Sequence, residues 1–137
     1  MSTCEINPTL LEKIEAFRFS KRSKGSSAIV CKINKDKLLI ELDSEEDAIE
    51  LEELAEDLPE NIPRYIILSY ELKHDDGRVS FPLVFLFYCP DGANTSLRML
   101  YASAKTFFQN MTKVGKDLEI QDAETLTDDW LRPKLLK

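Results

Sequence analysis

The sequence predicts a single α/β domain of the α+β kind, in which helices cover both faces of one mixed five-stranded sheet. Its 137 residues fit one domain with one core, so we expect residues 1–137 to fold together. Helical periodicity alternates with short runs of branched and aromatic residues, in the order helix, two strands, helix, two strands, long helix, strand, helix. Residues 64–72 and 79–88 are apolar on both faces, which indicates helices on both sides of the sheet.

The N-terminal half predicts two helices separated by a hairpin. The expected elements are a helix that begins at Asn7–Thr9 and ends near 20–27, strands at 27–33 and 38–42, and a helix over 44–59. Ser44 is a favourable N-cap for the second helix and Pro59 ends it. Eight acidic residues between positions 45 and 57 are expected to coat its outer side.

The C-terminal half predicts a second hairpin and a long helix. The expected elements are strands at 64–72 and 79–88, a helix over 96–111, a strand at 117–121, and a helix that begins after Thr127 and is kinked or shortened at Pro133. The turn HDDGR contains Asp-Gly, a strong hairpin signal. Since Pro82 cannot donate to a ladder, the hairpin is expected to project beyond the sheet at about 73–79.

One apolar residue of the long helix lies outside the predicted buried face. Helical spacing predicts a buried face of Leu97, Leu100, Tyr101, Ala104, Phe108 and Met111. Met99 instead projects about 140° from the centre of that face, at roughly 100° per residue. A single exposed apolar residue is common on protein surfaces, but a flexible hydrophobe between cations also suits a binding surface.

Composition excludes several classes of function. A formal charge of −7 and a pI near 4.8 disfavour nucleic acid as a partner, because binding to phosphates needs cations. Three widely spaced cysteines and one histidine argue against a disulfide framework or a zinc site, and we expect no metal and no cofactor. The longest apolar run, 81–89, is far shorter than the roughly 20 residues of a membrane helix, and no signal peptide is apparent.

The sequence favours binding over catalysis. His74 stands beside Asp75 and Asp76, but a solvated turn lacks the buried cleft and the orienting group of an acid/base site, so we expect no enzyme. A basic cluster of Arg18, Lys21, Arg22 and Lys24 follows the first helix. It has two interpretations, a solvated helix end or a surface that recognises an acidic protein or a phosphoinositide.

Several motifs resemble one family. The long helix contains RMLYASAK and follows a hairpin that ends in VFLFYCPDG. Together with the order of the elements over nearly the whole chain, these segments resemble the actin-depolymerising factor homology (ADF-H) domain. Within that superfamily FRFSK, HDDGRVSFPL and LTDDWLRPKL are similar to the glia maturation factor family, and HDDGRVSFPL is the most specific of them. The resemblance implies a protein that binds the actin-related protein 2/3 complex, inhibits its nucleation of actin and dissociates filament branches. It also implies weak or no binding to actin monomers and filaments.

The resemblance also implies where the partner binds. The residues that match the long-helix site of the superfamily are Arg98, Met99 and Lys105, and we expect Ala102 and Gln109 beside them to take part in binding. The hairpin reads HDDGR in place of a lysine-rich filament-binding segment, so we expect Asp75, Asp76 and Arg78 to form a different, second contact. Ser2 is the nearest match to a phosphorylated serine in relatives, where a dianion would repel an acidic partner. We expect a monomer in the cytoplasm at branched actin, such as cortical patches or the leading edge, with the nucleus as a further location.

Departures from the cofilin pattern keep an alternative open. Ser96, Gln109 and Asn110 stand where cofilins carry lysines, which should weaken contact with acidic actin. The segment YASAK, by contrast, is closer to the sequence that cofilins have at these positions. A cofilin-like protein that binds and severs filaments is therefore the second hypothesis, and a small enzyme that uses His74 is the third.

Overall fold

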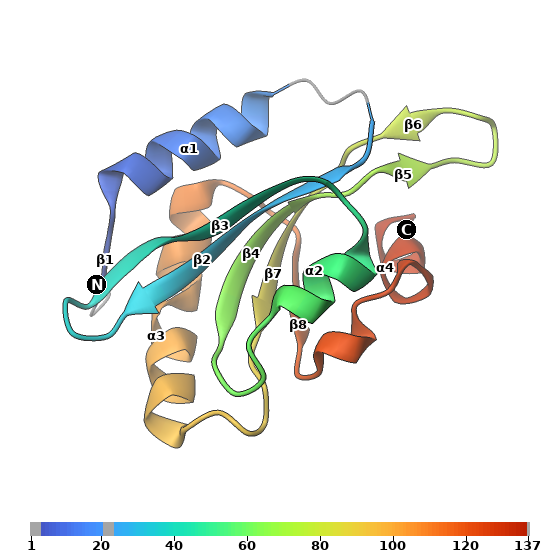
Figure 1. The fold of residues 1–137 in the computed structure, drawn as a ribbon. Helices are drawn as coiled ribbons and strands as arrows, with labels where there is room; N and C mark the ends of the chain where they lie inside the picture. Colours follow the sequence, from blue (N-terminus) through green and yellow to red (C-terminus); the bar gives the residue numbers. More distant parts are fainter. Residues whose placement is uncertain (1–3, 21–23, 137) are drawn as a thin grey trace.

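The computed structural model describes residues 4–20 and 24–136, in which a six-stranded mixed sheet lies between two layers of helices (Figure 1). The helices are α1 (Pro8–Phe19), α2 (Leu51–Asp57), α3 (Thr95–Thr112) and α4 (Asp128–Leu135), with a 3-10 turn η1 at Ala123–Thr125. The strands are β1 (Glu5–Ile6), β2 (Ser26–Asn34), β3 (Leu39–Ile49), β4 (Arg64–Ser69), β5 (Leu72–Lys73), β6 (Val79–Ser80), β7 (Leu83–Tyr88) and β8 (Asp117–Ile120). The predicted fold class is confirmed.

The main sheet has the strand order β1-β3-β2-β4-β7-β8. Its two outer pairs, β1 with β3 and β7 with β8, are parallel, and the inner pairs are antiparallel. Five strands were predicted. The sixth is β1, where Glu5 and Ile6 lie opposite Leu39 and Ile40. Two residues are too few to show an alternating pattern, so only the paired structure identifies this strand.

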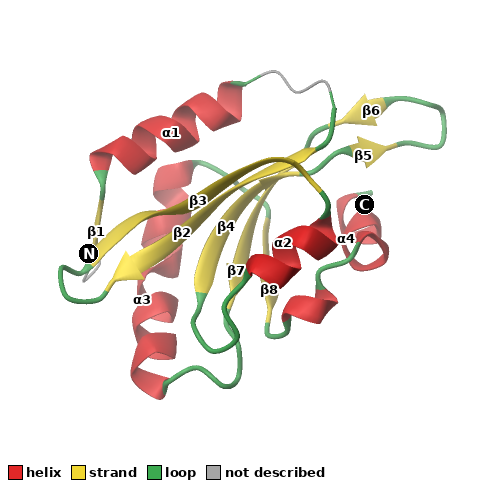
Figure 2. Ribbon diagram, viewed as in Figure 1, coloured by secondary structure: helices red, strands yellow, loops and turns green. Residues whose placement is uncertain are grey.

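Helices lie on both faces of the sheet (Figure 2), and each face carries its own core. Tyr65 on β4 and Phe85 on β7 pack with α1 and α3, whereas Ile66 and Leu86, one position along, pack with α2 and α4. Successive side chains of a strand point to opposite faces, so strands covered on both sides must be apolar at every position. The predicted coverage by helices on both sides is confirmed for β4 and β7, but not for residues 79–82, where Val79 is exposed in the separate hairpin.

The segment 44–49 was predicted as helix and is strand. β2 is buried along nearly its whole length, and its antiparallel pairing with β3 extends from Asn34↔Leu39 to Ser26↔Ile49. Without that partner the buried N–H and C=O groups of β2 would lack hydrogen bonds, and this tertiary requirement overrides the helical pattern. Ser44 is thus not an N-cap. α2 begins seven residues later, where Glu50 and Glu53 form a capping box.

The second predicted hairpin is interrupted in both strands. β4 ends at Ser69 and β7 begins at Leu83, and between them β5 and β6 form a separate two-stranded hairpin. Pro82 lies at the break, where its carbonyl accepts a hydrogen bond from the backbone N–H of Tyr70 at 3.1 Å. Figure 1 shows the β5–β6 hairpin extending beyond the main sheet, as expected for residues 73–79.

α3 has one buried face and one open face. Asn94 caps its N-terminus, and Tyr101, Ala104, Phe108 and Thr112 are buried against the sheet. Met111 was predicted on this face and is instead 45% exposed. The helix ends one residue after Thr112, where Lys113 adopts a left-handed conformation, so Thr112 rather than Met111 occupies the last buried position. Met99 is exposed, as predicted.

Two buried hydrogen bonds fix α3 on the sheet. The hydroxyl of Tyr65 on β4 donates to the backbone carbonyl of Tyr101. The hydroxyl of Tyr101 accepts a hydrogen bond from the backbone N–H of Ile33 on β2 at 2.9 Å. The two rings pack with centroids 5.3 Å apart. These contacts therefore fix the rotation of α3 about its own axis and its position above β2 and β4.

Burial raises the pKa of all four tyrosines, Tyr65, Tyr70, Tyr88 and Tyr101, above the usual value of about 10. The folded protein thus favours the neutral phenol more than the unfolded chain does. This contribution to stability is complete below about pH 10 and is lost as the pH rises through the pKa values of the folded state. In an alkaline titration followed by phenolate absorbance, the tyrosines of the folded protein should ionise at a higher pH than those of the protein in denaturant, which is the control. Equal titration curves in the folded and the denatured protein would contradict the buried positions.

Candidate functional site

The open face of α3 carries the predicted long-helix residues. Met99 is 67% exposed and Ala102 is exposed, whereas Arg98, Lys105 and Gln109 are half-buried at the flanks. The three polar side chains thus lie between the open face and the core. We call these five residues the long-helix surface.

Arg98 stands out on this surface. Its Nε atom is buried, and among the described residues it is the one buried side-chain nitrogen or oxygen without a hydrogen-bond partner. A buried donor without an acceptor is costly, and most such groups in folded proteins are paired. In this conformation the buried Nε is closed to an acceptor from outside, so only the rest of the half-buried guanidinium is available to a partner.

Lys105 and Gln109 are engaged within the protein. The ammonium of Lys105 forms an ion pair with the carboxylate of Asp117 at the start of β8. Its hydrogen bond lowers the pKa of Asp117 below the usual value. The side-chain amide of Gln109 donates to the carbonyl of Val114 at 3.1 Å. Both side chains connect the C-terminal half of α3 to the following loop and strand. Of the two cations on this surface, Arg98 is therefore the one with fewer polar contacts inside the protein.

The hairpin turn carries two charge pairs. The guanidinium of Arg78 lies 2.6 Å from Oδ2 of Asp76, and the hydrogen bonds from Arg78 lower the pKa of Asp76. Arg132 on α4 lies 3.3 Å from Oδ1 of Asp75. The first pair orders the turn itself, and the second links its tip to the C-terminal helix. We call Asp75, Asp76 and Arg78 the hairpin surface.

Within the described residues, His74 forms no hydrogen bond with a carboxylate. Its Nε2 lies 2.8 Å from the hydroxyl of Ser80 across the hairpin, and the adjacent carboxylates pair with arginines. The cysteines Cys4, Cys31 and Cys89 are buried and free of disulfides. Burial raises the pKa of Cys31, so its thiol remains protonated.

The structure describes only part of the basic cluster. Arg18 and Lys24 are described, whereas Lys21, Arg22 and the candidate phosphorylation site Ser2 lie outside the described residues. The guanidinium carbon of Arg18 lies 5.0 Å from the ring centroid of Phe19, which is 72% exposed. This exposed aromatic ring was not recognised in the sequence, where its spacing gave no signal. The N–H of Gly25 donates to Glu71, which brings the end of the cluster to the base of the hairpin.

Three carboxylates, from Glu50, Glu52 and Asp128, come within 4.8 Å of one another at the start of α2 and α4. All three are exposed. Exposed acidic groups of this kind are common without an ion, and we assign no metal here. No helix in the described ranges is long and apolar enough to cross a membrane.

Comparison with known proteins gives the family. Residues 3–136 match the model of the cofilin/tropomyosin-type actin-binding proteins. Glia maturation factor beta of Homo sapiens is 44% identical over 132 residues, which cover 96% of this chain and 92% of the relative. Glia maturation factor of Drosophila melanogaster is 39% identical over 96% of this chain and 95% of its own length. The chain belongs to the glia maturation factor family.

Solved structures agree with this membership. The solution structure of glia maturation factor from Caenorhabditis elegans is 35% identical and superimposes with a TM-score of 0.82, covering 98% of this chain and 96% of that one. Actin depolymerization factor 2 of Plasmodium berghei has a TM-score of 0.84 at 20% identity, which shows the shared fold alone. As a glia maturation factor with the ADF-H fold, the protein is an actin regulator, and its family is described by actin binding and not by a reaction.

The open position of Met99 gives a test of stability. Met99→Ala should change the free energy of unfolding by no more than about 0.5 kcal/mol, because its side chain has few contacts to lose. Phe108→Ala, on the buried face of the same helix, should lower it by about 3 to 5 kcal/mol. Urea denaturation of both variants measures the difference. A loss above about 1 kcal/mol from Met99→Ala would mean that Met99 packs in its own protein instead of facing a partner.

Proposed function

We propose that this glia maturation factor binds the actin-related protein 2/3 complex, inhibits its nucleation of actin and promotes dissociation of filament branches. The family membership supports this proposal, and the observation that carries it is the exposed Met99 on a rigidly held helix. We place the protein at sites of branched actin in the cytoplasm, acting as a monomer without a cofactor.

The long-helix surface is suited to an apolar cleft on the partner. The thioether of Met99 adapts to an irregular groove, and its full burial contributes about 1.5 to 3 kcal/mol. Ala102 leaves the surface beside it open. Arg98 adds a half-buried guanidinium beside Met99, and its positive charge suits a carbonyl or carboxylate of the partner. Since the hydrogen bonds of Tyr101 already fix α3, little ordering is needed on binding.

The hairpin surface provides a second, polar contact. It projects from the sheet and is ordered by its own charge pairs, so it reaches a neighbouring subunit without disturbing the core. We infer that the long-helix surface supplies most of the affinity. The hairpin makes contact only where a branch junction supplies the neighbour, and that differential contact shifts the complex away from its branched state.

A cofilin-like function is the second candidate. Cofilin-1A of Dictyostelium discoideum is 31% identical over 90% of this chain, and the family description is of actin binding. Co-sedimentation separates the two hypotheses. Saturable pelleting with bare filaments, without an effect on branch number, would favour the cofilin-like function over the proposed one.

Binding to the purified complex tests the long-helix surface. Met99→Ala should weaken binding about 10- to 100-fold, since each tenfold corresponds to about 1.4 kcal/mol. Met111→Ala is the matched control, because Met111 is also exposed on α3 but lies outside this surface. It should change affinity by no more than about twofold. Equal losses in the two variants would remove the long-helix surface from the interface.

The hairpin prediction concerns branch lifetime. Asp76→Ala with Arg78→Ala removes both members of one charge pair, so no unpaired charge remains, and the fold should be unaffected. This double variant should impair branch dissociation more than it impairs binding to the free complex. Asp36→Ala with Lys37→Ala, in the exposed turn between β2 and β3, is the control. Time-lapse counts of branches beside a binding titration decide the matter, and proportional losses in both would mean that the hairpin only adds affinity.

A further inference from the structure

A hollow lies on the face of the sheet opposite to α3. It has a volume of about 790 Å³ and lies between α2, the end of β8, η1 and Trp130 on α4. A second hollow of about 320 Å³ adjoins it, and the two share Ala55, Glu56, Ala123 and Glu124. They form one trough between α2 and η1, which we call the α2–η1 groove. α1 and α3 pack on the other face, so the groove is separate from the long-helix surface.

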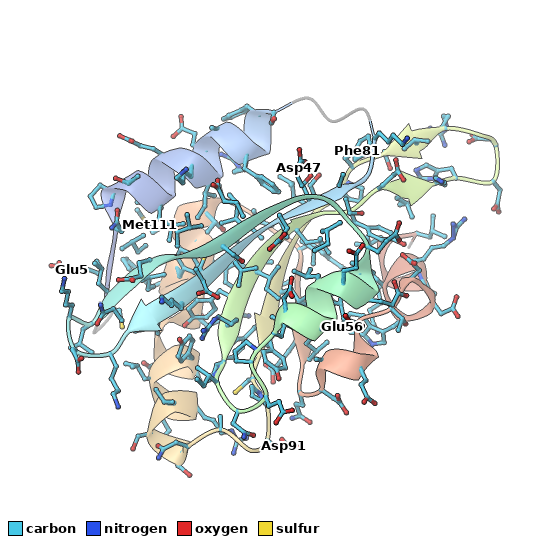
Figure 3. All side chains as sticks on the ribbon, viewed as in Figure 1. Glu5, Asp47, Glu56, Phe81, Asp91 and Met111 are labelled. Atoms are coloured by element: carbon cyan, nitrogen blue, oxygen red, sulfur yellow. The ribbon has the colours of Figure 1, made fainter. Side chains whose placement is uncertain are left out.

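The rim of the groove is acidic. Six carboxylates line the larger hollow, those of Glu56, Glu60, Asp91, Glu119, Asp122 and Glu124. None of the described residues that line either hollow is a lysine or an arginine. Figure 3 shows two members of the rim, Glu56 on α2 and Asp91 at the edge of the molecule. Like charges around one concave surface reinforce each other's field and attract cations.

The smaller hollow is lined mainly by apolar groups, and an aromatic ring lines the larger one. Ala55 and Ala123 are small, so the space between α2 and η1 stays open above the buried Leu126. Trp130 is half-buried in the wall, and the ammonium of Lys134 lies 5.0 Å from its ring centroid. Lys134 thus already lies against this ring in the free protein, so the attraction for the cations of a ligand comes from the carboxylates. The lining therefore matches a ligand with both aliphatic and cationic groups.

We propose that the α2–η1 groove binds a short basic segment of a partner protein, in which lysine or arginine alternates with aliphatic side chains. The cations meet the carboxylate rim and the aliphatic groups cover the alanine floor. The sign of the charge excludes nucleic acid and anionic membranes as occupants. A second copy of this chain is disfavoured by its own net charge of −7. Since the groove and the long-helix surface lie on opposite faces, both are occupied at the same time.

Trp130 provides the readout, because it is the only tryptophan of the chain. A synthetic peptide of alternating lysine and leucine, titrated at low salt, should change the fluorescence of Trp130 saturably, and added salt should weaken binding. The same peptide with glutamate in place of lysine should have no effect. Absence of a saturable change with the lysine peptide would overturn the proposal.

Matched variants locate the binding. Glu56→Lys with Glu124→Lys should weaken peptide binding by at least about tenfold, as expected when two like charges replace two opposite ones. Glu12→Lys with Glu15→Lys makes the same change in net charge at two exposed positions of α1, and should reduce affinity far less. Circular dichroism verifies that both variants are folded. Equal losses in the two would mean that the peptide responds only to net charge, against the proposal.

A variant that leaves the charge unchanged tests whether binding needs the open space of the groove as well as its negative charge. Ala123→Phe fills the trough without changing any charge and should also weaken peptide binding by at least about tenfold, because the apolar floor is covered. Unchanged binding in this variant would overturn the groove as the site. Sedimentation of the free protein tests the other occupant. A concentration-dependent dimer that Glu56→Lys with Glu124→Lys abolishes would identify a second copy in place of a partner segment.

Discussion

The hydrogen bonds of Tyr65 and Tyr101 are the constraint on which the rest of the structure depends. Ile33 on β2 donates to the hydroxyl of Tyr101, and Tyr65 on β4 donates to its carbonyl, so one helical residue is attached to two strands. Leaving the N–H of Ile33 or the hydroxyl of Tyr65 unpaired inside the core would cost about 1 to 3 kcal/mol. This attachment fixes the rotation of α3. The position of Met99 two residues away, exposed on the opposite side, follows from it.

The sheet separates two surfaces to which our proposals assign different partners. On the α1–α3 side, a held helix exposes a thioether beside a half-buried arginine, which suits an apolar cleft. On the α2–α4 side, carboxylates surround an alanine-floored groove, which suits cations. Strands that are apolar at every position permit this arrangement, because they bury a helix layer on each side. The hairpin contributes a third, polar surface, whose tip is linked to α4 by the pair of Asp75 with Arg132.

The sequence predicts the elements whose conformation depends mainly on residues that are close together in the chain. Phe85 and Leu86 show a strand covered on both faces, and the spacing of Tyr101, Ala104 and Phe108 shows a helix with one buried side. Residues 44–49 could not be predicted correctly, since their conformation is set by β2, a partner outside the local window. The ion pair of Lys105 with Asp117 and the groove between α2 and η1 likewise join segments whose approach exists only in the folded chain. Met99 was found because an exposed apolar residue breaks a regular pattern.

The central claim is that α3 presents Met99, and not the rest of its exposed surface, to the branch-nucleating complex. Oxidative footprinting of Met99 and Met111 tests it most directly, because both thioethers are exposed on one helix, about 18 Å apart at 1.5 Å per residue. The account predicts that a saturating amount of the actin-related protein 2/3 complex slows the oxidation of Met99 and leaves that of Met111 unchanged. Oxidation of Met99 at the same rate with and without the complex would contradict it.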